Sequence, residues 1–314
     1  MAPLPAAEAL GVYGKIPSQG DFFRVNASDP SAQALDRWVQ EGLDALHRAG
    51  LSLPRRPVFF IHHGSPQGAF APTIGALYPS HDSAGRVYPL VVFARADVQW
   101  MAGRFSAAPT AYGLFLRDAA QLASMASGAD GPTLAAHARS LRVPSPSELA
   151  AVDGVCRHAL DAVAAGSVHH RLFGDPAVGL RYYAFRTAID AADGARNRTA
   201  RGVVTLDLPL GGDTDLFLWL ELLRRRLAGA TFLPSVVWIE ESPAPHALTS
   251  MGAAPGPMLR WLVQPDPAAM ALWPVTTQRP DAIHQAWQSL APHHRQALDA
   301  FDIPLETLLA TLAR

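Results

Sequence analysis

The chain has 314 residues, of which 49% are hydrophobic and 17% charged, and its formal net charge is -1. This composition supports a packed core and excludes a mostly disordered chain, while the near-zero charge excludes a global basic field for nucleic acid or an anionic membrane. The single cysteine, Cys156, excludes an internal disulfide and a cysteine-rich metal site. Because no apolar run is long enough for a membrane span and the N-terminus lacks a signal-peptide pattern, we expect a cytoplasmic protein.

The first half of the chain predicts alternating strands and helices. A strand over 10–14 leads into a loop over 15–24, and a helix follows, with Asp29 as its N-cap, Pro30 at its first position and Gly50 just past its end. The runs on either side of a turn at 81–85 could pair as an antiparallel hairpin. The strands predicted after the first helix lie over 57–62, 70–80 and 86–94.

The second half continues with mixed patterns. Helical patterns come first, then strands, and the chain ends in short amphipathic helices. The predicted helices lie over about 108–127, 131–140 and 146–164, followed by a loop over 194–202, a strand over 202–208, a buried helix from about 215, a strand over 232–240, a Pro- and Gly-rich loop over 241–257 and a helical tail over 281–314.

This alternation predicts an α/β or α+β fold: a layered sheet, mixed or partly antiparallel, with helices packed on both faces. A boundary is suggested near residue 145, where the chain reads VPSPS. The region 146–314 can contribute strands to the same sheet as the first half.

One short motif points to metal chemistry. The string HHGSP places His62 and His63 at the end of an apolar strand, and a neutral imidazole is a good iron or zinc ligand. The H-G-S-P part resembles a motif of the LigB-type extradiol dioxygenases, which implies iron binding by His63. The alternative is a pair of structural histidines, one exposed and one hydrogen-bonded. We expect no bound cofactor or metal.

Two longer stretches place turn residues beside charges at strand ends. The first is GKIPSQGDF, residues 14–22, and the second is DSAGRVYPL, residues 82–90. Lys15, the only lysine of the chain, could face Asp21 across the first stretch, and Asp82 could pair with Arg86 across the second. These charges either lock two turns against the sheet or line one polar pocket.

The order G-K-x-P-S-x-G-D-F, a helix carrying Trp38, and then P-S-x-D-x-x-G-R-x-Y-P-L resembles the TagF (ImpM) family of type VI secretion-associated proteins. The resemblance covers roughly 10–95 well and marks 1–145 as a TagF-like N-terminal domain, whereas the PSVVW stretch from Pro234 is a looser match. The residues it assigns to partner binding are Lys15, Pro17, Ser18, Gly20, Asp21, Phe22, Asp82, Gly85, Arg86 and Tyr88.

The resemblance implies a non-catalytic, cytoplasmic regulator that represses type VI secretion after translation by binding a forkhead-associated (FHA) domain component of the secretion machine. Two alternatives stay open. One is a metal-dependent oxygenase of extradiol-dioxygenase type that uses His63. The other is an adaptor that dimerises through tail residues at helical spacing, Leu298, Phe301, Leu305, Leu308, Leu309 and Leu312, for which burial within the chain is the competing explanation.

Overall fold

Nine strands form one sheet within the residues that the computed structural model describes, which are 9–63, 70–197, 203–212, 214–230, 232–240, 242, 244–266 and 268–314. The strand order is β2-β1-β5-β4-β3-β7-β8-β6-β9, and every pairing is antiparallel except that of β6 with β9. This confirms a mixed, largely antiparallel sheet. The strands are β1 (Leu10–Gly14), β2 (Phe23–Val25), β3 (Val58–His62), β4 (Thr73–Tyr78), β5 (Leu90–Arg95), β6 (Thr205–Pro209), β7 (Ser235–Ile239), β8 (His246–Ser250) and β9 (Leu272–Pro274).

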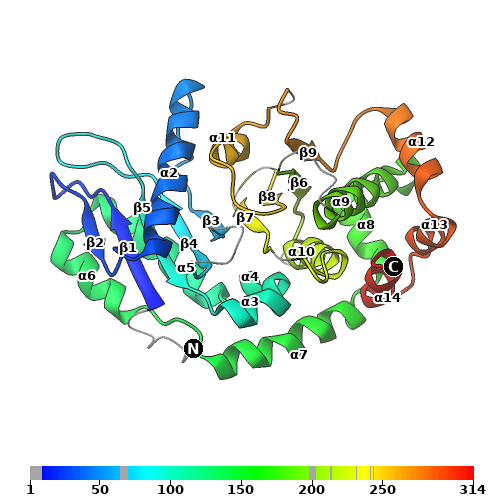
Figure 1. Cartoon of the computed structure of the whole chain (residues 1–314), viewed down its shortest axis with the longest axis horizontal. Helices are drawn as coiled ribbons and strands as arrows, with labels where there is room; N and C mark the ends of the chain where they lie inside the picture. The colour runs from blue at the N-terminus through cyan, green and yellow to red at the C-terminus, as the bar shows by residue number, and fades with distance from the viewer. Residues whose placement is uncertain are drawn as a thin grey trace.

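Helices cover both faces of this sheet, as the sequence predicts (Figure 1). One face packs against α2 and α11. On the other face α5 lies on β4 and β5 and α6 on β1 and β2, and residues of α9 and α10 belong to the same apolar cluster as that face. The helices are α2 (Pro30–Arg48), α3 (Val98–Arg104), α4 (Ala108–Ala111), α5 (Gly113–Ser124), α6 (Gly131–Ser140), α7 (Pro146–Ala162), α8 (Ala165–Phe173), α9 (Leu180–Arg196), α10 (Asp215–Arg226), α11 (Met258–Val263), α12 (Pro280–Ser289), α13 (Pro292–Asp299) and α14 (Leu305–Leu312), with short 3-10 turns η1 (Phe105–Ala107), η2 (Met125–Ser127) and η3 (Pro176–Val178).

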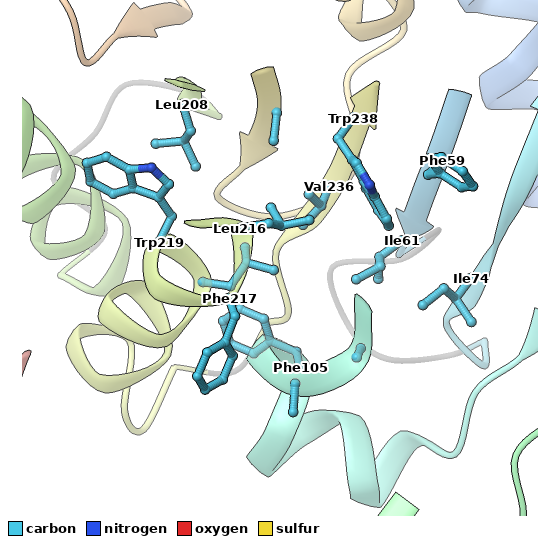
Figure 2. Close-up of a cluster of buried hydrophobic side chains, with 14 of the residues drawn as sticks. Phe59, Ile61, Ile74, Phe105, Leu208, Leu216, Phe217, Trp219, Val236 and Trp238 are labelled. Carbon is cyan, nitrogen blue, oxygen red and sulfur yellow. The ribbon is translucent and has the colours of Figure 1, made fainter. Parts of the chain in front are cut away.

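The two halves of the chain meet at the centre of the sheet. Strand β3 pairs with β7, and Phe59 lies opposite Trp238, with their rings stacked at 5.5 Å. Aromatic and β-branched residues suit this position because the strand is buried on both faces. Figure 2 shows that one apolar cluster continues across the junction, from Ile61 and Ile74 of the first half to Val236 of the second.

The helix capping predicted for the first half is confirmed. The side chain of Asp29 accepts hydrogen bonds from the backbone N–H of Ser31 and Ala32, Pro30 is the first residue of α2, and Gly50 adopts φ +68° after its end. The antiparallel pairing of the runs around 81–85 is also confirmed, since β4 pairs with β5, although β5 begins at Leu90.

Two stretches differ from the sequence predictions. The predicted loop over 241–257 is wrong in its middle, because β8 lies there, held between β7 and β6. The helix predicted over 108–127 is divided into α4, α5 and η2. Strand β8 is stabilised by ladder hydrogen bonds on both sides, so its own sequence carries little of the signal.

The tail leucines lie inside the molecule. Leu298, Leu305, Leu308, Leu309 and Leu312 are all at most 2% exposed in the main core. The structure therefore favours burial within the chain over a dimerisation face. None of the helices in the described ranges has the length and apolarity that crossing a bilayer would need.

Candidate functional site

A glycine brings the end of β1 against the start of β5. Gly14 has φ +144°, and a Cβ at this position would lie 2.1 Å from the carbonyl oxygen of Pro89. Any other side chain would push the two strands apart at this point. This close approach places Lys15, the next residue, beside the segment 80–88. We call residues 15–24 the first bend, residues 80–88 the second bend, and their joint exposed face the two-bend surface.

The second bend is built around the carboxylate of Asp82. Its Oδ1 accepts hydrogen bonds from the backbone N–H of Ala84 at 3.0 Å and of Arg86 at 2.9 Å, while the Arg86 Nε donates to Oδ2 at 2.7 Å. Gly85, between them, has φ +79°, a conformation that favours glycine. The Asp82–Arg86 pair expected from the sequence is confirmed.

Three contacts join the two bends. Lys15 Nζ lies 2.9 Å from Asp82 Oδ2. The backbone N–H of Ser83 donates to the Gln19 carbonyl at 2.9 Å, and Arg86 Nη2 donates to the Gly20 carbonyl at 2.6 Å. The expected facing of Lys15 and Asp21 is wrong: Lys15 pairs with Asp82, and Asp21 is exposed. An aspartate already fixed by its own bend offers a buried lysine a better partner than an exposed one.

The buried charges at this junction are balanced. Asp82 is 0% exposed and Lys15 is 8% exposed. Burial alone would raise the pKa of Asp82, but the hydrogen bonds from Lys15, Arg86 and the Ala84 N–H hold that pKa well below its usual value. The carboxylate is therefore charged throughout the physiological range, and the bends are locked together at neutral pH.

Aromatic side chains extend from this junction to the surface. Phe22 is 36% exposed and its ring meets the edge of Tyr88 at 4.9 Å, with Lys15 Nζ 5.6 Å and the Arg24 guanidinium 5.5 Å from its centroid. Tyr88 is buried and donates a hydrogen bond from its hydroxyl to Asp36 of α2. The pKa of Tyr88 is raised, mainly by burial and further by its neighbours Tyr13 and Asp36. The two-bend surface is thus braced by α2 from behind.

The other predicted positions contribute less to this junction. Pro17 is half-buried, and Ser18 is exposed and donates its hydroxyl to the Ala129 carbonyl at 3.3 Å. Gly20 has room for a Cβ, since the nearest atom would be 3.5 Å away. The structure brings Lys15, Gly20, Phe22, Asp82, Gly85, Arg86 and Tyr88 together, and it leaves Asp21 outside their contacts.

Sequence reasoning missed three residues of this surface. Asp36 lies on the polar face of α2, Arg24 lies over Phe22, and Val87 is 72% exposed beside Arg86. No local sequence pattern indicates that Asp36 belongs to this surface, because its hydrogen-bond partner Tyr88 is 52 residues away. Val87 could have been found, since an apolar residue between Arg86 and Tyr88 on a short bend has little room to be buried.

The paired histidines do not form a metal centre in the described part of the chain. His62 and His63 are both buried, so the expectation of one exposed ring is wrong. The His62 ring stacks on Trp38 at 5.3 Å, and burial, then His63, lowers its pKa to about 3. The described residues contain no group of three His, Cys, Asp or Glu side chains that could hold a metal ion, and residues 64–69 of the motif lie outside them.

A comparison with known protein families matches the region that holds the two motifs. Residues 11–140 match the family described as the TagF N-terminal domain, type VI secretion system-associated. Among solved structures, the chain is similar to the crystal structure of PA0076 from Pseudomonas aeruginosa PAO1, with 14% identity and a TM-score of 0.47 over 84% of this chain and 98% of that one. Curated protein sequences give no significant match.

Proposed function

We propose that the chain, whose residues 11–140 match the TagF N-terminal domain described as type VI secretion system-associated, is a non-catalytic, cytoplasmic regulator of that secretion system. It represses secretion by binding an FHA-domain component of the secretion machine. The observation that carries the proposal is the two-bend surface, where both family motifs meet through the Lys15–Asp82–Arg86 contacts.

The two-bend surface has the make-up of a protein-docking site. Its backbone is fixed before binding by hydrogen bonds that involve Asp82, so little conformational entropy is lost on association. It exposes an aromatic ring at Phe22, an apolar side chain at Val87 and a guanidinium at Arg86, whose side chain is 63% exposed. Aromatic residues and arginine are enriched among the anchors of protein interfaces.

The charges indicate the chemistry of the partner surface. Asp82 is shared between Lys15 and Arg86, so this cluster carries one excess positive charge. Arg24, next to Phe22, has its nearest carboxylate at 3.9 Å, in Asp36. With the exposed Asp21 included, the three cations Lys15, Arg24 and Arg86 of the two bends exceed the two carboxylates, Asp21 and Asp82, by one charge. The surface therefore fits a partner segment that offers an apolar side chain beside a carboxylate.

The test is a binding measurement with the purified full chain and FHA-domain proteins encoded with the same secretion system. We expect Phe22→Ala to weaken binding by about tenfold or more, the typical cost of losing an aromatic anchor. Val87→Asp adds a negative charge beside Arg86 and should also weaken binding. The matched control is Val155→Asp on α7, where the valine is 63% exposed and far along the chain from both bends.

Two results would count against the proposal. Binding that is equally strong in wild type, Phe22→Ala and Val87→Asp would remove the two-bend surface from the interface. Absence of binding to every FHA-domain protein of the system would remove the partner. In cells, deletion of the gene should raise secretion, and the Phe22→Ala variant should fail to restore repression.

A further inference from the structure

A groove of about 560 Å³ lies between the turn η3 and the helices α9 and α12. Figure 1 shows α12 next to α9, at the opposite end of the molecule from β2. The volume falls in the range of about 300–1,000 Å³ that is typical of binding pockets. All residues that line the groove lie outside residues 11–140. The groove is therefore separate from the two-bend surface, and an inference about it does not depend on the proposed regulatory function.

Two exposed apolar side chains line this groove. Val178 of η3 is 55% exposed, and Trp287 of α12 is 39% exposed. The half-buried Tyr182 of α9 and Ile283 of α12 lie in the same lining. Single apolar residues scattered over a surface are ordinary, but a group of them in one concave place is typical of a binding site. We therefore ask which ligand this lining suits.

The two aromatic rings of the groove are held in place by neighbours within the chain. The Arg181 guanidinium lies 4.2 Å from the centroid of the Tyr182 ring. The Arg295 guanidinium lies 4.5 Å from the centroid of the Trp287 ring, and the His284 ring stacks on that indole at 6.2 Å. Side chains fixed in this way lose little conformational entropy when a ligand packs against them.

Three polar side chains of the lining supply hydrogen-bond donors. The amide nitrogen of Gln288 donates to Nε2 of His284 at 2.8 Å, so the proton of this imidazole lies on Nδ1. The Thr277 hydroxyl oxygen accepts from the backbone N–H of Arg279 at 3.2 Å, which leaves its own proton for a ligand. The indole of Trp287 can only donate. These groups suit a ligand that is rich in acceptors.

The lining is also free of formal charges. None of the residues that form it, all within the described part of the chain, is an aspartate, glutamate, lysine or arginine. The charged residues on either side of Pro280, Arg279 and Asp281, pair with each other at 2.6 Å. A charged side chain of a ligand would lose hydration in this groove without gaining a partner of opposite sign. The lining therefore complements an uncharged ligand.

We propose that this groove binds an uncharged, proline-rich segment of a partner protein in the extended polyproline II conformation. Proline rings pack against tyrosine and tryptophan rings, and grooves lined by such rings are a recurring means of recognising these segments. A proline residue offers a carbonyl acceptor and has no N–H, which matches the donors of Thr277, His284 and Trp287. Because the polyproline II helix is formed before binding, its association costs little entropy.

The experiment uses calorimetry with the full chain and three synthetic peptides. The probe is acetyl-PPLPPLPP-amide. In acetyl-AALAALAA-amide each proline is replaced by alanine, and in acetyl-PPEPPEPP-amide each leucine is replaced by glutamate. We expect the probe to bind at one site and both comparison peptides to bind about tenfold more weakly or less. The indole N–H signal of Trp287 in nuclear magnetic resonance spectra should shift as the probe saturates the groove.

Three variants make the test specific. Trp287→Ala removes an aromatic anchor and should weaken probe binding by about tenfold or more. Val178→Asp places a carboxylate in the neutral lining and should weaken it to a similar extent. Because Val178 is exposed, this variant tests the groove even if Trp287→Ala fails to fold. The matched control is Val155→Asp on α7, where the valine is 63% exposed and outside the groove, and it should bind the probe like the wild type.

The proposal is overturned if the probe does not bind, if the glutamate peptide binds as tightly as the probe, or if Val178→Asp and Val155→Asp bind the probe alike. Equal or tighter binding of the alanine peptide would indicate a helical partner segment and would overturn it as well. These results would leave the docking function of the two-bend surface untouched, because its test uses FHA-domain proteins and variants of Phe22 and Val87.

Discussion

Two regions of the molecule each contain a buried carboxylate that pairs with two cations, but the partners come from different parts of the chain. Asp82 at the two-bend surface receives two backbone N–H groups, Arg86 from its own bend, and Lys15 from a distant loop. Glu221 on α10 receives Arg224 and Arg225 from its own helix, at spacings of three and four residues, and the Ser106 hydroxyl from η1.

The difference lies in what each carboxylate holds together. Asp82 fixes the shape of a surface, because it joins two exposed segments and its neighbours Phe22 and Arg86 reach the solvent. Glu221 fixes the packing of the core, since Arg225 continues from it to Glu306 on α14. A buried acid with two cations is thus a structural device that becomes functional only where exposed recognition groups lie next to it.

The largest expected effect comes from breaking the core network. Glu221→Ala would leave Arg224 and Arg225 partly buried without their shared counter-ion and the Ser106 hydroxyl unpaired. Removal of one partner of a buried ion pair costs about 3–5 kcal/mol. We expect a loss of this size in the free energy of unfolding, measured by urea denaturation.

The control for that variant is Glu306→Ala, at the outer end of the same network. The Glu306 side chain is 37% exposed, and exposed ion pairs contribute about 0–1 kcal/mol. If Glu306→Ala lost as much free energy of unfolding as Glu221→Ala, the buried end of the network would contribute no more to stability than the exposed end.

The next effect is a loss of stability in acid to which a buried histidine contributes. The pKa values of Asp82 and Glu221 are lowered on folding, so these two acids add to the loss only as the pH approaches the unfolded carboxyl pKa values of about 4. His169, buried among Phe173, Phe185 and Phe301, has its pKa lowered to about 4, with burial as the main cause and Arg181 the next.

The sign of the histidine effect follows from proton binding. As the pH falls from about 6.5 to about 4, the unfolded state binds a proton at this position and the folded state does not, so stability falls by up to about 3 kcal/mol. His169→Leu should be less sensitive to pH in this window, as read from unfolding midpoints at pH 4.5 and 7. Equal sensitivity in the two proteins would contradict the assignment.

The smallest expected effect is a difference in stability between alanine variants at two glycines of the two-bend surface, Gly85 and Gly20. Gly85→Ala places a side chain at φ +79° and should cost about 1–2 kcal/mol, whereas Gly20→Ala meets no atom closer than 3.5 Å and should change stability little. Thermal unfolding measures both. If Gly85→Ala were as stable as Gly20→Ala, backbone conformation would not be what requires a glycine in the second bend.

The sequence alone already indicated the elements whose causes are local. Helix α2 is marked by Asp29, Pro30 and Gly50, each of which acts within one turn of the helix end. The β4–β5 pairing is marked by two strand-forming runs around one turn. The mixed sheet with helices on both faces, and the match of residues 11–140 to the TagF N-terminal domain, followed from patterns and motifs of the same kind.

Only the tertiary structure determined which side chains and strands pair with one another. Whether Lys15 pairs with Asp21 or Asp82, that Tyr88 donates to Asp36, and that His246–Ser250 is a strand all depend on segments far apart in the chain. A buried charge takes the carboxylate that the fold has already oriented, and a short strand forms where two neighbours supply its hydrogen bonds. Neither condition is written within a few residues of the position it controls, because both are set by packing rather than by local propensity.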